Sequence, residues 1–268
     1  MKDMEKKTAS DFSNAIRKFQ EQTDQMSKML QNLIQPIIDT MNRWKEILAP
    51  IIEVNRQFEQ MLPKITIPDS FRAVLKLGDA QYVYWEYLSE AFKKDVIGAA
   101  DTDQMLLEFE SRNDYSASET LISECEQHKF VIPYKTLYDE CIRSYHSGAY
   151  HLSAVGLTSV IDAVLAEASN NPTHKALERC NAIVKKLEEK EDIDEKEYAV
   201  LALEITFSAT VEFFYKPAPF TEAEPNGLNR NWIAHGRSTR DYTRLDCLKL
   251  IRLLYGIIVF DELENSDN

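Results

Sequence analysis

Apolar residues recur at helical spacing along most of the chain. In the stretch 12–61 they are Ile16, Phe19, Met26, Met29, Leu30, Leu33 and Ile34. This is the spacing of one face of an α-helix. Pro36 and Pro50 interrupt the pattern, and each would remove a helical hydrogen bond and clash with the preceding turn. The pattern therefore predicts an amphipathic helical arm with kinks or breaks at both prolines.

The polar positions of this arm mix Glu, Asp, Gln and Lys, and they lack the Lys/Arg-rich face of a helix that lies on a membrane. Packing in a bundle or against a second copy is favoured, and a regulatory protein partner for these N-terminal helices is compatible with the pattern. Residues 71–110 predict one or two more helices, with aromatic residues typical of a core (Tyr82, Tyr84, Trp85, Tyr87 and Phe92).

A polar, turn-rich stretch, ESRNDYSASET, follows these helices and predicts a boundary. We therefore divide the chain into a helical N-terminal arm and linker bundle (1–110), a linker (111–130) and a helical domain (131–268). Within the last part, the helical pattern predicts segments at about 133–146, 149–169, 173–190 and 194–215.

The segment 149–169 is apolar on most sides, which predicts a buried central helix. Its Asp162 would then need a polar partner, because an unpaired buried carboxylate is costly. Residues 216–227 hold three prolines and a glycine, and predict a loop. A final helix is expected at about 243–262, with Thr243 and Asp246 spaced as a capping box. No strand pattern appears, so the predicted fold class is all-α.

Composition limits the classes of function. The formal net charge of −13 argues against broad, non-specific attraction to nucleic acid or anionic membranes. The N-terminal residues lack an apolar leader, and no run approaches the roughly 20 apolar residues of a membrane span, so we expect a cytoplasmic protein. The four cysteines are far apart and have no histidine at ligand spacing. We expect them to be reduced and structural, and we expect neither a metal nor a cofactor.

Candidate chemistry lies in the heptapeptide Arg230-Asn231-Trp232-Ile233-Ala234-His235-Gly236, between the Pro-rich loop and the last helix. It resembles the motif of the HEPN superfamily, in which an arginine, often followed by a polar residue, precedes a histidine by four to six positions. The resemblance covers roughly residues 131–268 and implies a HEPN-like helical bundle. It also implies metal-independent cleavage of RNA, with Arg230, Asn231 and His235 as the catalytic residues.

The chemistry of RNA explains why these residue types suit the reaction. The 2′-OH attacks the adjacent phosphate when a base removes its proton and a cation stabilises the developing charge. A histidine exchanges protons near neutral pH, and an arginine binds phosphate bidentately and stays charged. In bacteria, stand-alone proteins of this family often act in phage defence or as growth-arresting toxins, which is the biological role that the resemblance implies.

Residues five positions apart on an ideal helix point about 140° apart, so Arg230 and His235 would not share one face. HEPN ribonucleases typically pair two protomers so that both motifs line one cleft, and the resemblance therefore implies a homodimer with a composite site. Residues 230–252 hold six basic against two acidic side chains. Among them, Arg237, Arg240 and Arg244 are candidate RNA contacts, and Asp162 is a candidate polar support of the site.

Another interpretation of the motif stays open. His235 could end a helix, Arg230 could pair with Asp162 or a glutamate, and Asn231 could be a cap, as in a non-catalytic HEPN-like scaffold that assembles through its N-terminal helices. Some toxins of the family carry a tyrosine two positions after the histidine for modification by a partner enzyme. Here Arg237 occupies that position, which argues against such a pairing.

Overall fold

The computed structural model describes residues 68–86, 88–173, 175–188 and 197–265. The chain divides into two compact units, Met1–Thr66 and Ile67–Asn268, and every described residue belongs to the second unit. The amphipathic arm predicted at 12–61 lies outside the described residues.

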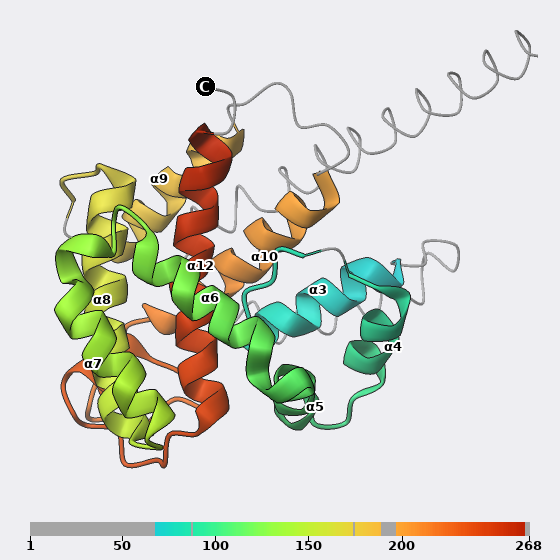
Figure 1. Cartoon of the computed structure of the whole chain (residues 1–268), viewed down its shortest axis with the longest axis horizontal. Helices are drawn as coiled ribbons and strands as arrows, with labels where there is room; N and C mark the ends of the chain where they lie inside the picture. The colour runs from blue at the N-terminus through green and yellow to red at the C-terminus, as the bar shows by residue number, and fades with distance from the viewer. Residues whose placement is uncertain (1–67, 87, 174, 189–196, 266–268) are drawn as a thin grey trace, which may run out of the picture. The chain divides into compact units, whose positions relative to one another are not determined.

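In this described part, the protein is all-α, as predicted (Figure 1). Ten α-helices and two short 3-10 turns follow one another, with no strand among these residues. Their bounds are α3 (Asp69–Asp79), α4 (Glu90–Gly98), α5 (Thr102–Glu110), η2 (Arg112–Tyr115), α6 (Ser116–Gln127), η3 (Ile132–Tyr134), α7 (Lys135–His146), α8 (Tyr150–Ser169), α9 (Ala176–Glu188), α10 (Glu197–Phe214), α11 (Arg230–Ala234) and α12 (Arg244–Asn265).

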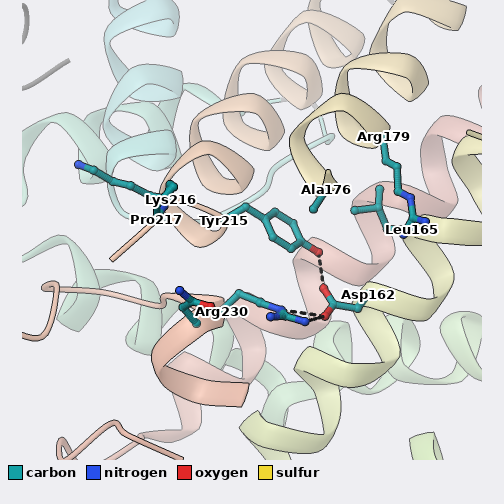
Figure 2. Close-up of a pocket in the computed structure, with 9 residues that line it drawn as sticks. Asp162, Leu165, Ala176, Arg179, Tyr215, Lys216, Pro217 and Arg230 are labelled. Atoms are coloured by element: carbon teal, nitrogen blue, oxygen red, sulfur yellow. Dashed lines mark hydrogen bonds and ion pairs between the residues drawn. The ribbon is translucent and has the colours of Figure 1, made fainter. Parts of the chain in front are cut away.

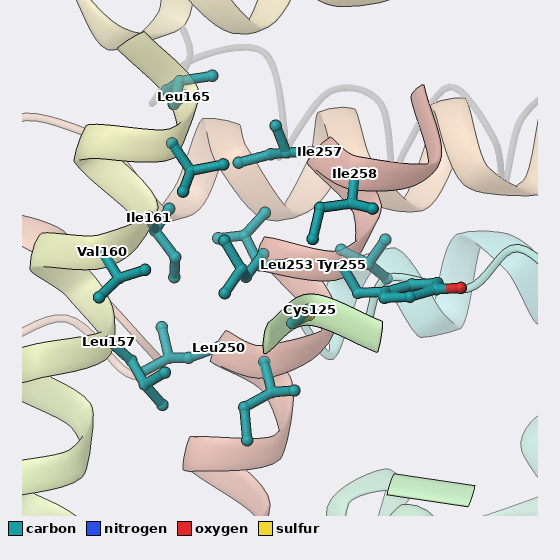
Figure 3. Close-up of a cluster of buried hydrophobic side chains, with 14 of the residues drawn as sticks. Cys125, Leu157, Val160, Ile161, Leu165, Leu250, Leu253, Tyr255, Ile257 and Ile258 are labelled. Carbon is teal, nitrogen blue, oxygen red and sulfur yellow. The ribbon is translucent and has the colours of Figure 1, made fainter. Parts of the chain in front are cut away.

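The core forms around α8 and α12, which pack against each other along their length. Leu157, Ile161 and Leu165 of α8 face the apolar side chains of α12 (Figure 3). Every residue of α12 from Leu245 to Phe260 is buried, because other helices cover it on several sides. The predicted buried central helix is therefore confirmed, and its partner is the last helix of the chain.

Helix α8 has the length and the apolar composition of a membrane span, and it is the one helix that does so in the described residues. A core helix has the same composition, and most of α8 is buried inside the protein. Its neighbours are α7, α9, α11 and α12. Packing within the bundle is thus sufficient to explain why this helix is so apolar.

The aromatic segment before α4 departs from the helical expectation. Tyr82, Val83 and Tyr84 are buried, but they lie in a non-helical connection between α3 and α4. The backbone N–H of Tyr84 donates to the hydroxyl of Thr206 on α10 at 3.0 Å, a tertiary bond that replaces the missing helical one. Tyr82, Tyr84 and Phe92 of the aromatic cluster are core, as predicted, and Trp85 is partly buried against the core. Tyr87 lies outside the described residues.

The predicted linker at 111–130 contains helix α6, which packs on α12. Three consecutive residues with positive φ, Asn113, Asp114 and Tyr115, turn the chain sharply before it. This polar turn has the composition of a linker, but Leu121, Ile122 and Cys125 of the following helix are buried in the main core. The structure therefore places residues 67–130 and 131–268 in one compact unit, with the division of the chain at residue 66.

Candidate functional site

Helix α11 is a five-residue turn that carries Arg230 and Asn231 and is followed by His235. The side chain of Asn229 caps it by accepting from the backbone N–H groups of Asn231 and Trp232 at 3.1 and 3.4 Å. Trp232 and Ile233 are buried and anchor the turn. The cap is therefore Asn229, so the side chain of Asn231 is not needed for this purpose.

Arg230 is held by Asp162 of the central helix (Figure 2). Its Nε and Nη2 atoms donate to Oδ2 of Asp162 at 2.9 and 2.8 Å, and the hydroxyl of Tyr215 donates to Oδ1 at 2.9 Å. Burial raises the pKa of Tyr215 well above its ordinary value, which keeps its hydroxyl protonated and able to donate. The polar partners required by Asp162 are thus Arg230 and Tyr215.

A cleft of about 450 Å³ opens beside this ion pair, between α8, α9, α11 and the residues after α10. Its polar lining consists of Asp162, Arg179, Tyr215, Lys216, Arg230 and Asn231. Three cationic side chains and one carboxylate therefore line the cleft, in a protein whose formal charge is −13. The cleft is locally suited to an anion.

His235 does not line this cleft. It ends α11, its side chain is exposed, and its ring meets the ring of Phe220 at 5.6 Å between centroids. Phe220, in the Pro-rich loop, also contacts Trp232 and lies under the guanidinium of Arg237 at 4.8 Å. The structure brings Arg230 and Asn231 to one cleft, which His235 does not line. The separation of His235 from Arg230 agrees with their angular spacing, but its separation from Asn231 does not, because residues four positions apart on a helix would share a face.

The basic residues that follow the motif do not form one surface. Arg237 is exposed and stacks on Phe220, whereas Arg240 pairs with Asp246 at 2.5 Å and Arg244 donates to the hydroxyl of Tyr150 at 3.2 Å. Lys249 and Arg252 are buried and paired with Asp103 and Glu110. The excess of basic residues along 230–252 therefore does not produce an equally positive surface in the folded protein, because carboxylates from other helices neutralise much of it.

Among the described residues, the other candidate ligands and nucleophiles form no second site. All four cysteines are free and buried, and burial raises the pKa of Cys141 to about 11 and that of Cys247 to about 12. Such thiols are poor nucleophiles at neutral pH. Within the described residues, no group of three or more His, Cys, Asp or Glu side chains is arranged to hold a metal ion.

Sequence reasoning missed three residues of the cleft region. Tyr215 ends the segment predicted as a helix, Lys216 begins the loop, and Arg179 lies on α9, one turn after Ala176. None of them carries a motif, and they meet Arg230 only because α8, α9 and α10 converge on α11. The spacing of residues along the chain could not have revealed them.

No protein-family model matches the chain, and no curated protein or solved structure does either. The likeness to HEPN proteins therefore remains a prediction from the motif.

Proposed function

We propose that the chain is a metal-independent endoribonuclease of HEPN type. The observation that carries this proposal is the position of Arg230 at a cationic cleft, oriented by Asp162. A guanidinium has five N–H donors, and Asp162 occupies two of them. The remaining donors can bind a phosphate oxygen while the ion pair holds the side chain in one orientation.

The reaction requires a proton transfer in addition to charge stabilisation. The 2′-oxygen loses its proton to His235 and bonds to the adjacent phosphorus, while the bond from phosphorus to the 5′-oxygen breaks and that oxygen gains a proton. The products are a 2′,3′-cyclic phosphate and a free 5′-OH. Arg230 and Asn231 would stabilise the charge that builds on the phosphoryl oxygens.

A second copy of the chain would complete the site. His235 lies outside the cleft that holds Arg230 and Asn231, so one protomer presents the cation without the proton carrier. His235 of the partner subunit could supply this group in a homodimer with a composite site. A cytoplasmic role in bacterial phage defence or as a toxin belongs to the same proposal and rests on the family resemblance.

The second candidate is a non-catalytic HEPN-like interaction protein that assembles through its N-terminal helices. The ion pair between Arg230 and Asp162 favours this alternative, because it gives the arginine a structural role that needs no RNA. The two candidates differ in the expected effect of replacing His235, whose side chain is exposed. In a nuclease, the replacement removes activity and leaves the fold intact. In an interaction protein, there is no activity to lose.

The test is incubation of the wild type, His235→Ala and His146→Ala with mixed cellular RNA in EDTA, followed by mapping of the new ends. His146 is also exposed and lies on α7, outside the cleft lining. We expect cyclic phosphate ends from the wild type and from His146→Ala, and a rate at least about 100-fold lower from His235→Ala.

Folded wild-type protein that leaves RNA intact, alone and in extract from phage-infected cells, would rule out the nuclease and leave the interaction protein. Cleavage that His235→Ala retains in full would instead show that a different side chain transfers the proton.

A further inference from the structure

Arg179 of α9 is a cation of the cleft that has no ion-pair partner among the described residues. Its Nε atom is buried and makes no hydrogen bond, and no carboxylate pairs with its guanidinium among the described residues. A buried donor without an acceptor costs free energy. The guanidinium of Arg179 therefore keeps N–H donors that no carboxylate among the described residues occupies.

Lys216 adds a second cation where the chain leaves α10. Asn229 fixes its backbone by donating to its carbonyl oxygen at 2.9 Å, so the same residue that caps α11 also positions this end of the cleft. The side chain of Lys216 is exposed. Burial raises the pKa of Glu212, one turn earlier on α10, and the positive charge of Lys216 partly offsets that rise.

The charges in the cleft do not cancel. Among the described residues, Asp162 is the only carboxylate in the lining, and both of its oxygens are occupied by Arg230 and Tyr215. Within the lining, Arg179 and Lys216 therefore have no carboxylate of their own, although Glu212 outside the lining interacts with the charge of Lys216. Apolar side chains, Leu165, Ala176 and Pro217, complete the wall, so the cleft offers both an anion site and a surface for an uncharged group.

We propose that this cleft binds a phosphate-bearing ligand, whose anionic oxygens are held by Arg179 and Lys216 and by the N–H donors of Arg230 that Asp162 leaves available. A phosphate group matches the planar fork of an arginine and the excess charge. A cleft of about 450 Å³ has the size of a small-molecule site, so the ligand extends beyond the phosphate. This binding does not depend on RNA cleavage.

The phosphate could belong to a free phosphate compound or to an RNA strand, and two probes distinguish these sources. One is inorganic pyrophosphate, and the other is a short single-stranded oligonucleotide with 2′-O-methyl groups, which lacks the attacking hydroxyl. Calorimetric titration of the full-length protein with each probe measures the affinity. The probe that the wild type binds more tightly identifies the source.

Three variants test the assignment of residues. Arg179→Gln should weaken binding of the preferred probe about tenfold, because a charge-assisted pair is lost, and Arg179→Lys should recover part of the loss. Lys216→Gln should weaken it about two- to threefold, because its side chain is solvated. Arg143→Gln is the matched control, because Arg143 is exposed on α7 and pairs with Glu140. This variant should bind the probe with the same affinity as the wild type.

The assignment is overturned if the folded wild type binds neither probe, or if both Arg179→Gln and Lys216→Gln bind as tightly as Arg143→Gln does. Lys216→Gln keeps the test valid should Arg179→Gln fail to fold. Phosphate binding without RNA cleavage would support this inference and reject the nuclease. RNA cleavage that neither substitution affects would support the nuclease and reject this inference.

Discussion

Glu110 and Arg252 form an ion pair whose side chains are each 1% exposed. The hydroxyls of Tyr82 and Ser118 also donate to Glu110, at 2.6 and 2.5 Å. The pair therefore connects α5, α6, α12 and the segment after α3. Burial by itself would raise the pKa of Glu110, but the charge of Arg252 and these hydrogen bonds outweigh it and lower that pKa.

We expect Glu110→Gln to lower the free energy of unfolding by about 3–5 kcal/mol at pH 7, because Arg252 would remain buried without a counter-charge. The pKa of Glu110 is lowered on folding, so its contribution is present above the ordinary carboxyl pKa and is lost as the pH falls below about 4. Urea unfolding of both proteins at pH 7 and pH 3 measures this difference.

The exposed Glu108 of α5 provides the control, because among the described residues its side chain accepts a hydrogen bond only from Gln104, one turn away. Glu108→Gln should stay within about 0.5 kcal/mol of the wild type. A destabilisation by Glu110→Gln that is as large at pH 3 as at pH 7 would show that the charge of Glu110 is not its cause.

Arg230 and His235 should respond differently to replacement by alanine. The carboxylate of Asp162 is 29% exposed and would keep only Tyr215 as a partner in Arg230→Ala, so we expect a loss of about 1–3 kcal/mol in stability. His235→Ala should stay within about 0.5 kcal/mol, because its ring is exposed. Thermal unfolding of both variants measures this, and a larger loss for His235→Ala than for Arg230→Ala would contradict the assigned contacts.

At the scale of helices, Gly156 sets how closely α7 and α8 approach. A Cβ atom at this position would lie 2.3 Å from the Sγ atom of Cys141, which no packing tolerates. Gly156→Ala should therefore destabilise the protein by about 1–3 kcal/mol. A Cβ atom on Gly98 would meet nothing within 4 Å, so Gly98→Ala is the matched control and should be neutral or slightly stabilising.

The double variant Gly156→Ala, Cys141→Ala tests the cause of that loss. The next contact of the added Cβ, with the Cβ atom of Cys141, would be 3.7 Å, an ordinary van der Waals distance. Removing the thiol should therefore recover much of the stability lost in Gly156→Ala, once the cost of Cys141→Ala alone is subtracted. Additive losses in a denaturant-unfolding cycle would mean that the two helices are kept together by other contacts.

The sequence predicts some helices well and others not at all, for reasons visible in the structure. Helices α7, α8, α10 and α12 were expected near their observed bounds because each presents an apolar face or is apolar throughout. Helix α6 was missed because it begins in a polar stretch. Tyr82 and Tyr84 have helical neighbours in sequence, but their burial between α3 and α10 determines their conformation. The residues next to them in the sequence do not indicate this burial.

In the candidate site, too, features that depend on neighbouring residues were predicted better than contacts between residues far apart in the sequence. The motif from Arg230 to His235, the capping box at Thr243 and the need of Asp162 for a partner follow from spacing and burial, and the structure contains the box and the partner. The pair of Arg230 with Asp162 was one of the alternatives that the sequence left open, whereas the neutralisation of Lys249 and Arg252 could not be predicted. Arg230, Lys249 and Arg252 find their carboxylates 68, 146 and 142 positions away, and only the assembled bundle defines those pairs.

For the whole molecule, these pairs determine how binding to RNA should depend on salt. Affinity for a single strand falls with a slope of about −0.7 on logarithmic axes for each phosphate neutralised. A continuous patch of the six basic residues at 230–252 would give a slope of about −4. The structure instead offers Arg179, Lys216 and Arg230 at the cleft, which predicts a slope of about −2 or shallower.

Titration of the 2′-O-methyl oligonucleotide at salt concentrations from about 0.05 to 0.3 M measures this slope. Arg179→Gln should make it shallower by about 0.7, whereas Arg244→Gln should leave it unchanged, because Arg244 is engaged with Tyr150 and lies over the ring of Tyr115. A wild-type slope near −4 would mean that the strand takes Arg240, Arg244, Lys249 and Arg252 from their internal partners. Since Lys249 and Arg252 are buried in the core, such binding would require the bundle itself to open.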